Sequence, residues 1–189
     1  MATNDTATRL AELEAGTDLA TALAFYDGLP PVTVDQMIGA WKGSGIPTGN
    51  PFDGLLEQYG WHGKRFDSAD GAYPLLFDKG EGVISVDPSR IPLSIALEHG
   101  GLARSSAAAG LFKLGAGLIA SSKPHARLRM TEYRGVVSAT MIYDALPVND
   151  VFRAAGPDTL VGAMDMRGLA DPFFFTLRRE AAAAAGDRS

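Results

Sequence analysis

The sequence predicts a mainly β protein with helical additions, built around antiparallel strands that close into a barrel or a strongly curved sheet. From Arg127 onward, apolar and polar residues alternate with a period of two, and turn residues divide this part into five short segments. Short strands at such close spacing are typical of an antiparallel meander. The period is helical in two other places, near the N-terminus and in the alanine-rich stretch 106–121.

The composition is that of an ordinary globular domain. The chain has 189 residues, of which 46% are hydrophobic and 21% are charged, and its net charge is −5. A chain of this length can bury one sizeable core, so we expect a single domain over 1–189. Within it, 18–87 would form a first half and 106–180 a second half that completes the barrel.

The composition also excludes several classes of chemistry and partner. The sequence has no basic stripe, which argues against nucleic acid as a partner. It has no cysteine, which excludes disulfides, thiolate catalysis and cysteine-based metal sites. No secretory signal is apparent, and the longest apolar stretch, 111–120, is too short to span a bilayer. We therefore expect a cytoplasmic protein without a membrane span.

The first half is expected to mix short helices with strands. Residues 5–28 predict a helix, with Asp18 as a candidate N-cap and Pro30-Pro31 ending the pattern. The other elements expected here are a strand at 37–41, a glycine- and proline-rich loop at 44–54, a helical turn at 55–59, and strands at 73–77 and 82–86.

The second half is expected to consist of a helix followed by strands. Proline and glycine break any regular element over 88–106, whereas 106–121 predicts a buried or lid-like helix over the barrel. The strands expected beyond it are 127–134, 136–144, 147–153, 159–166 and 173–179.

Both tryptophans of the chain lie between glycines, in Gly39-Ala40-Trp41-Lys42-Gly43 and in Gly60-Trp61-His62-Gly63. Together with Pro47-Thr48-Gly49 and Gly54-Leu55-Leu56, these motifs resemble the GXWXG-domain family of bacterial proteins. The second half is similar to the uncharacterised domain that accompanies GXWXG. The motifs that carry this likeness are Ala126–Met130, Glu132–Gly135, Ile142–Asp144, Phe152-Arg153, Gly162–Asp165 and Pro172–Phe175.

The resemblance covers about residues 18–180 and implies no particular reaction. The Gly-x-Trp-x-Gly element is also similar to the first strand of calycins, namely lipocalins, fatty-acid-binding proteins and haem-binding nitrobindins. By that analogy the expected fold is a calycin-like antiparallel β-barrel with an N-terminal helix and a helical insertion near 106–121.

The two tryptophans are expected to have different roles. In such a barrel, Trp41 would pack across the closed end, while a neighbouring glycine lets another backbone approach closely. Trp61 follows a loop and is the better candidate for the wall of a pocket. If 60–66 is a regular strand, His62, Lys64 and Phe66 share the face opposite Trp61. Either Trp61 or His62 then points into the barrel, but not both.

The candidate catalytic residues are those that could exchange a proton inside the barrel. Histidine exchanges protons near neutral pH, and carboxyl or tyrosine side chains can do so when they are buried. The alternative is that His62 lies on the surface and that the carboxylates pair in solvent with arginines of the same strands. The predicted catalytic residues are His62, Tyr143, Asp144 and Asp165.

The candidate ligand-binding residues are aromatic and sulfur-containing side chains of the predicted strands. A barrel interior that is partly apolar and partly tyrosine or carboxylate suits a small hydrophobic molecule with one polar group. Phe173-Phe174-Phe175 must turn at least one ring away from the core, either under the N-terminal helix or into an exposed patch suited to a dimer contact. The predicted ligand-binding residues are Trp41, Trp61, Tyr133, Met141, Met164 and Phe174.

No cofactor or metal is expected. The three histidines have no second ligand at metal-binding spacing, and nucleotide-binding glycine motifs are missing from the sequence. The last strands also lack the histidine that the nitrobindin analogy would require for haem.

Three functions are therefore considered. The first is binding of a small hydrophobic ligand, such as a lipid, steroid or terpenoid, in a barrel cavity. The alternative is a cofactor-independent lyase or isomerase, with dehydratase-type acid–base chemistry on a terpenoid or other hydrophobic alcohol. The third is a homodimeric or structural partner protein that uses the Phe173–Phe175 surface.

Overall fold

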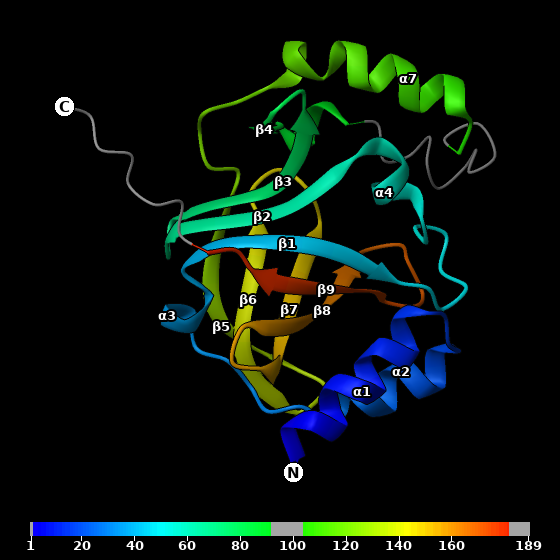
Figure 1. Ribbon diagram of the computed structural model, residues 1–189. Coiled ribbons are helices and arrows are strands. Elements are labelled where there is room, and N and C mark those ends of the chain that lie inside the picture. Colours follow the sequence, from blue (N-terminus) through cyan, green and yellow to red (C-terminus); the bar gives the residue numbers. More distant parts are fainter. Residues whose placement is uncertain (1, 92–103, 182–189) are drawn as a thin grey trace.

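The fold is a single antiparallel sheet that closes on itself (Figure 1). The computed structural model describes residues 2–91 and 104–181. The strands follow the order β2-β1-β9-β8-β7-β6-β5-β3-β4, and β2 also pairs with β3, so the strands form a ring. The nine strands are β1 (Gly39–Ile46), β2 (Trp61–Ser68), β3 (Gly71–Lys79), β4 (Gly82–Ser85), β5 (Ala126–Tyr133), β6 (Val136–Tyr143), β7 (Val148–Gly156), β8 (Thr159–Met166) and β9 (Phe173–Arg179).

Helices cover the ring at two opposite places. In Figure 1, α1 and α2 lie at the bottom, against the outside of the sheet, and α7 lies at the top beyond β4. The helices are α1 (Ala2–Glu14), α2 (Leu19–Asp27), α3 (Val34–Met37), α4 (Leu55–Tyr59) and α7 (Ser106–Gly115), with 3₁₀ turns η1 (Pro88–Arg90) and η2 (Ala116–Ile119). Within the described ranges, no helix has the length and apolar character needed to cross a membrane.

The predicted fold class is confirmed: the protein is mainly β, antiparallel and barrel-like, with N-terminal helices and a helical insertion at 106–119. The strands expected from Arg127 onward are all present, with ends that differ by at most three residues. Most of 88–106, where no regular element was expected, lies outside the described residues.

Two local predictions in the first half are wrong. The single helix expected over 5–28 is two helices, because Gly16 takes a left-handed φ of 120° and Asp18 starts a new helix by accepting the amide of Thr21. Asp18 is therefore an N-cap, as predicted. The loop expected at 44–54 begins later, because Gly45 and Ile46 pair with Phe175 and Phe174 of β9.

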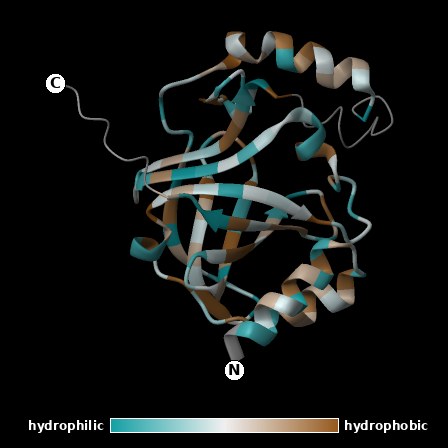
Figure 2. Ribbon diagram, in the orientation of Figure 1, coloured by the Kyte–Doolittle hydropathy of each residue, from teal (hydrophilic) through white to brown (hydrophobic). Residues whose placement is uncertain are grey.

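The closed sheet has a core inside the ring and a second core outside it. Figure 2 shows hydrophobic and hydrophilic bands alternating along the strands, as expected when successive side chains point to opposite faces. Phe173 and Phe175 belong to the inner core, while Phe174 packs outside against Tyr26 of α2, with 5.6 Å between ring centroids. All three rings are buried. The Phe173–Phe175 run is therefore covered within the chain, one ring under the N-terminal helices, and forms no exposed patch.

Ion pairs hold the N-terminal helices against the outside of the sheet. Glu14, at the end of α1, accepts hydrogen bonds from Arg178 at 2.7 and 2.8 Å and from the hydroxyl of Thr176 at 2.7 Å. Burial alone would raise the pKa of Glu14, but these hydrogen bonds and the charge of Arg178 outweigh it, and the pKa is lowered from 4.5. Asp27, at the end of α2, receives two hydrogen bonds from Arg134.

We predict that Glu14→Gln destabilises the protein in a pH-dependent way. Because the folded-state pKa is lowered, the stabilisation is present above the unfolded value of about 4.5 and is lost as the pH falls through the folded value. The cost at pH 7 should be about 1–2 kcal/mol, or roughly 3–6 °C in melting temperature. Circular dichroism melts between pH 3 and 8 measure it, with Glu12→Gln, a surface pair with Arg9, as the control. A pH-independent difference would contradict this assignment.

Candidate functional site

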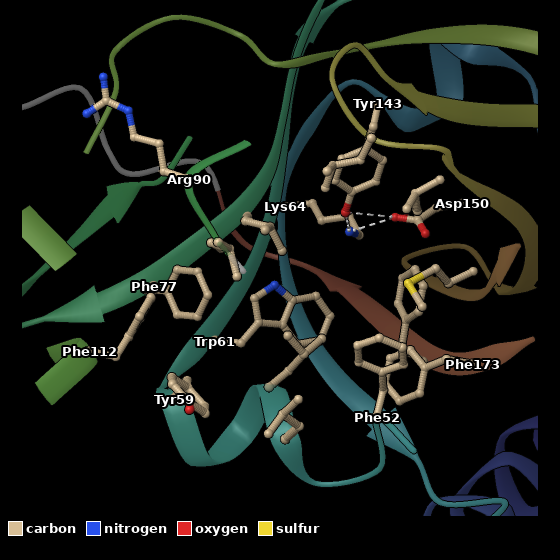
Figure 3. A pocket seen from close by; sticks show the side chains of 18 of the residues that line it. Phe52, Tyr59, Trp61, Lys64, Phe77, Arg90, Phe112, Tyr143, Asp150 and Phe173 are labelled. Carbon is tan, nitrogen blue, oxygen red and sulfur yellow. Dashed lines mark hydrogen bonds and ion pairs between the residues drawn. The ribbon is translucent and has the colours of Figure 1, made fainter. Parts of the chain in front are cut away.

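A largely apolar cavity of about 340 Å³ opens at the end of the ring that α4 and α7 cover (Figure 3). Strands β2, β3 and β6–β9 form its walls, and helices α4 and α7 with turns η1 and η2 cap it. The side chains that line it are Phe52, Leu55, Leu56, Tyr59, Trp61, Lys64, Leu75, Phe77, Arg90, Ile91, Ala108, Phe112, Ile119, Tyr143, Leu146, Val148, Asp150, Met164, Phe173 and Phe175.

Trp61 reaches the cavity because Gly43 leaves room for its ring. Gly43 lies on β1, next to β2, and a Cβ at this position would overlap the Cη2, Cζ3 and Cζ2 atoms of Trp61. On its cavity side the indole packs edge-on against Phe175, with 5.8 Å between centroids. Gly43, the last glycine of the first Gly-Trp motif, therefore leaves the space that the Trp61 ring of the second motif occupies. The two motifs pack directly against each other.

Trp41 occupies another part of the inner core. Its side chain is fully buried, its Nε1 donates to the carbonyl of Met37 at 2.7 Å, and the guanidinium of Arg179 stacks over its ring at 4.1 Å. Trp41 does not line the cavity.

Strand β2 carries Trp61 inward and His62 outward. The His62 ring lies outside the cavity between two carboxylates, with Nδ1 2.6 Å from Asp78 and Nε2 3.0 Å from Glu180. Lys42 lies 3.1 Å from the same Nδ1.

The expected alternation along 60–66 is wrong beyond His62. The pairing of β2 with β3 shifts register on either side of Gly63, which has a φ of 150° and lies against the carbonyl of Trp41. This irregularity returns Lys64 and Phe66 to the interior, on the same side as Trp61. Gly63 therefore allows the side chain of Lys64 to point into the barrel.

An ion pair between Lys64 and Asp150 lies at the inner end of the cavity (Figure 3). The Nζ and Oδ2 atoms are 2.8 Å apart, and the two side chains are only 3% and 1% exposed. Lys64 also donates to the carbonyl of Pro74 at 3.0 Å, and the Tyr143 hydroxyl lies 3.5 Å from both charged groups. The ammonium group also lies 5.0 to 5.8 Å from the ring centroids of Phe175, Trp61 and Tyr143.

Burial sets the acid–base properties of this cluster. Loss of hydration raises the pKa of Asp150, although the ammonium of Lys64 opposes the shift. The pKa of Tyr143 is raised well above 10 by burial and by the neighbouring charge of Asp150. Asp150 and Tyr143 are the titratable pair best placed to hold or move a proton inside the cavity.

The other predicted site residues are spread over the fold. Met164 and Tyr143 line the cavity, whereas Met141 is buried in the inner core away from it. Tyr133 and Phe174 lie outside the ring, near Tyr26 under the N-terminal helices.

The two predicted catalytic aspartates lie outside the cavity. Asp144 is exposed and pairs with Arg127 at 2.7 Å, and Asp165 is exposed on β8. Lys64 and Asp150 were missed as site residues, although the alternation of 147–153 could have placed Asp150 on the inner face. In the part of the chain that the structure describes, no three acidic or histidine side chains form a group that could hold a metal ion.

Comparison with known proteins gives two family matches. Residues 24–82 match the model of the GXWXG protein family, and residues 124–179 match a domain of unknown function, DUF4334. The chain is also similar to a protein from Thermomonospora curvata of known crystal structure, with 34% identity over 94% of this chain and 99% of that chain and a TM-score of 0.68. No curated protein matches. The buried ion pair joins the two matched regions, because Lys64 belongs to the first and Asp150 to the second.

We predict that Gly43→Ala displaces the Trp61 ring and destabilises the fold by about 1–3 kcal/mol, because the added methyl group has no free space. Gly110→Ala is the control: Gly110 lies in α7 with no atom near its added Cβ, so this change should be neutral or stabilise by about 0.5–1 kcal/mol. Urea unfolding and tryptophan fluorescence measure both. If the two variants are equally stable and their fluorescence is unchanged, Gly43 is not needed to make room for the Trp61 ring.

Proposed function

Since the chain belongs to the GXWXG family and carries the accompanying domain DUF4334, neither of which names an activity, we propose from its cavity that the protein binds a small hydrophobic molecule. The observation that carries the proposal is the lining, in which aromatic and aliphatic side chains from both halves surround one buried ion pair. Ligand sites in proteins typically combine such apolar walls with a few placed polar groups.

The volume limits the size of the ligand. An apolar cavity of about 150 Å³ holds one benzene ring, so 340 Å³ has room for roughly thirteen non-hydrogen atoms. Among the lipids, terpenoids and steroids considered from the sequence, this size favours a terpenoid or a medium-chain lipid. A steroid would require the cap of the cavity to move outward.

Helix α7 is proposed to act as the lid of the cavity. Its Phe112 is the inward anchor, with ring centroids 5.1 Å from Tyr59 and 4.9 Å from Phe77. Ser105 caps the start of the helix, because its hydroxyl accepts a hydrogen bond from the amide of Ala108. Just before it, Arg104 donates to the carbonyl of Pro51. Outward displacement of this helix would open the cavity to a ligand without disturbing the strand ladders.

A second candidate function is a cofactor-independent lyase or isomerase. The observation that favours it is the proximity of Asp150 and Tyr143, two proton carriers in a largely apolar cavity, 3.5 Å apart. His62, Asp144 and Asp165 lie outside the cavity, so this candidate uses Asp150 and Tyr143 for proton transfer to and from the bound molecule. Gas chromatography after incubation with bound ligands tests it, and conversion should be lost in Tyr143→Phe.

We predict that Phe112→Ala weakens ligand binding at least tenfold, because it removes the inward anchor of the lid. Leu111→Ala is the matched control, since Leu111 is the preceding residue, 71% exposed, and makes no part of the cavity. Thermal shift and native mass spectrometry with monoterpenoids, medium-chain lipids and steroids measure binding. If both variants bind equally, the lid is contradicted. If no member of this panel binds to the wild-type protein, the proposed function is contradicted.

A further inference from the structure

We propose that the ligand is uncharged and carries a hydroxyl group, which donates a hydrogen bond to Asp150 at the inner end of the cavity. This inference rests on the proposed function and names the chemical class that the same cavity selects.

Two buried polar atoms among the lining residues have no partner in the described parts of the chain. One is Oδ1 of Asp150, an acceptor, and the other is Nε1 of Trp61, a donor. Figure 3 shows the second carboxyl oxygen of Asp150 directed at Lys64 and Tyr143, which leaves Oδ1 free. A buried polar atom without a partner is unfavourable, because it has lost its hydrogen bonds to water. A ligand that offers a hydrogen to Oδ1, or an oxygen to Nε1, provides the missing hydrogen bond.

Lys64 is not available as a donor to the ligand. Its three ammonium hydrogens face Asp150, the carbonyl of Pro74 and the Tyr143 hydroxyl. The Tyr143 hydroxyl in turn lies between Lys64 and Asp150. The hydrogen bond that this cluster lacks is therefore one that a ligand donates to Asp150. The ammonium of Lys64 is not free to bind an anionic group there.

Charge balance excludes ionised ligands from the inner end. Lys64 and Asp150 neutralise each other in a site with almost no exposure to water. A carboxylate next to Oδ1 would add a second negative charge, and an ammonium would leave a net positive charge, each without compensation. The other lining cation, Arg90, lies on η1 with its guanidinium bonded to the carbonyl of Leu118 and near Asp87, and Figure 3 shows it directed away from the ion pair.

Two sets of probes that differ only in their polar group test the inference. Menthol, menthone and menthane carboxylate share a ring skeleton, and decanol, decyl methyl ether and decanoate share a linear one. In the wild-type protein, calorimetry should show at least tenfold tighter binding of each alcohol than of the matching ketone or ether, because only the alcohol donates to Asp150. The carboxylates should bind most weakly.

The variants assign this preference to named atoms. Trp61→Phe should reduce the affinity for alcohols, whereas Trp41→Phe should not change the preference, since the Trp41 donor is already bonded to Met37. In Asp150→Asn the amide oxygen must face Lys64, which turns the free position into a donor, so the preference should reverse toward menthone. If Asp150→Asn does not fold, Lys64→Met/Asp150→Leu removes both charges together and should bind all uncharged probes without preference.

The outcomes separate the two proposals. Equal affinities for alcohol and ketone in the wild-type protein, or tighter binding of the carboxylates through Arg90 at the mouth, overturn the hydroxyl inference and leave ligand binding intact. An alcohol preference that persists in Lys64→Met/Asp150→Leu also overturns it. If none of the six probes binds and the wider panel also fails, the proposed function itself is overturned.

Discussion

The ion pair between Lys64 and Asp150 is the interaction on which the arrangement of the cavity depends. Moving two charges out of water is costly, and attraction across 2.8 Å offsets that cost only when both partners are held in place. Here β2 supplies one charge and β7 the other, so the correct closure of the ring is required before either charge is compensated. The ion pair thus gives a largely apolar cavity a charged inner end.

The glycines of the first half make that arrangement possible. Gly43 leaves the space that the Trp61 ring fills, and Gly63 takes a backbone conformation that brings Lys64 back to the interior. The motif that identifies the family is thus a set of close approaches between β1 and β2, and its tryptophans contribute in different ways. The Trp41 donor is bonded within the core, whereas the Trp61 donor has no partner among residues 2–91 and 104–181.

The fold could be predicted from the sequence much further than the site. Period-two alternation and turn residues locate the strands after Arg127, since these signals are local. The site depends on which face each side chain occupies, and one irregularity at Gly63 changes the face of every residue that follows it in β2. Asp150 becomes a candidate site residue only because it pairs with Lys64, which is 86 positions away in the sequence. No local sequence pattern predicts such a pair. The conspicuous candidates His62, Asp144 and Asp165 instead have partners or solvent outside the ring.

The number of paired residues between neighbouring strands differs around the ring. Strands β7 and β8 pair along their whole length, whereas β3 and β5 meet through a single residue pair, Ala72 with Ala126. The segment that carries α7 leaves the sheet after β4 and returns at β5, next to this seam. In mechanical terms, the cap is attached beside the joint of the cylinder that has the fewest paired residues. The seam strand β3 also carries Pro74, whose carbonyl accepts a hydrogen bond from Lys64 at 3.0 Å, so the compliant joint and the charged end of the cavity share a strand.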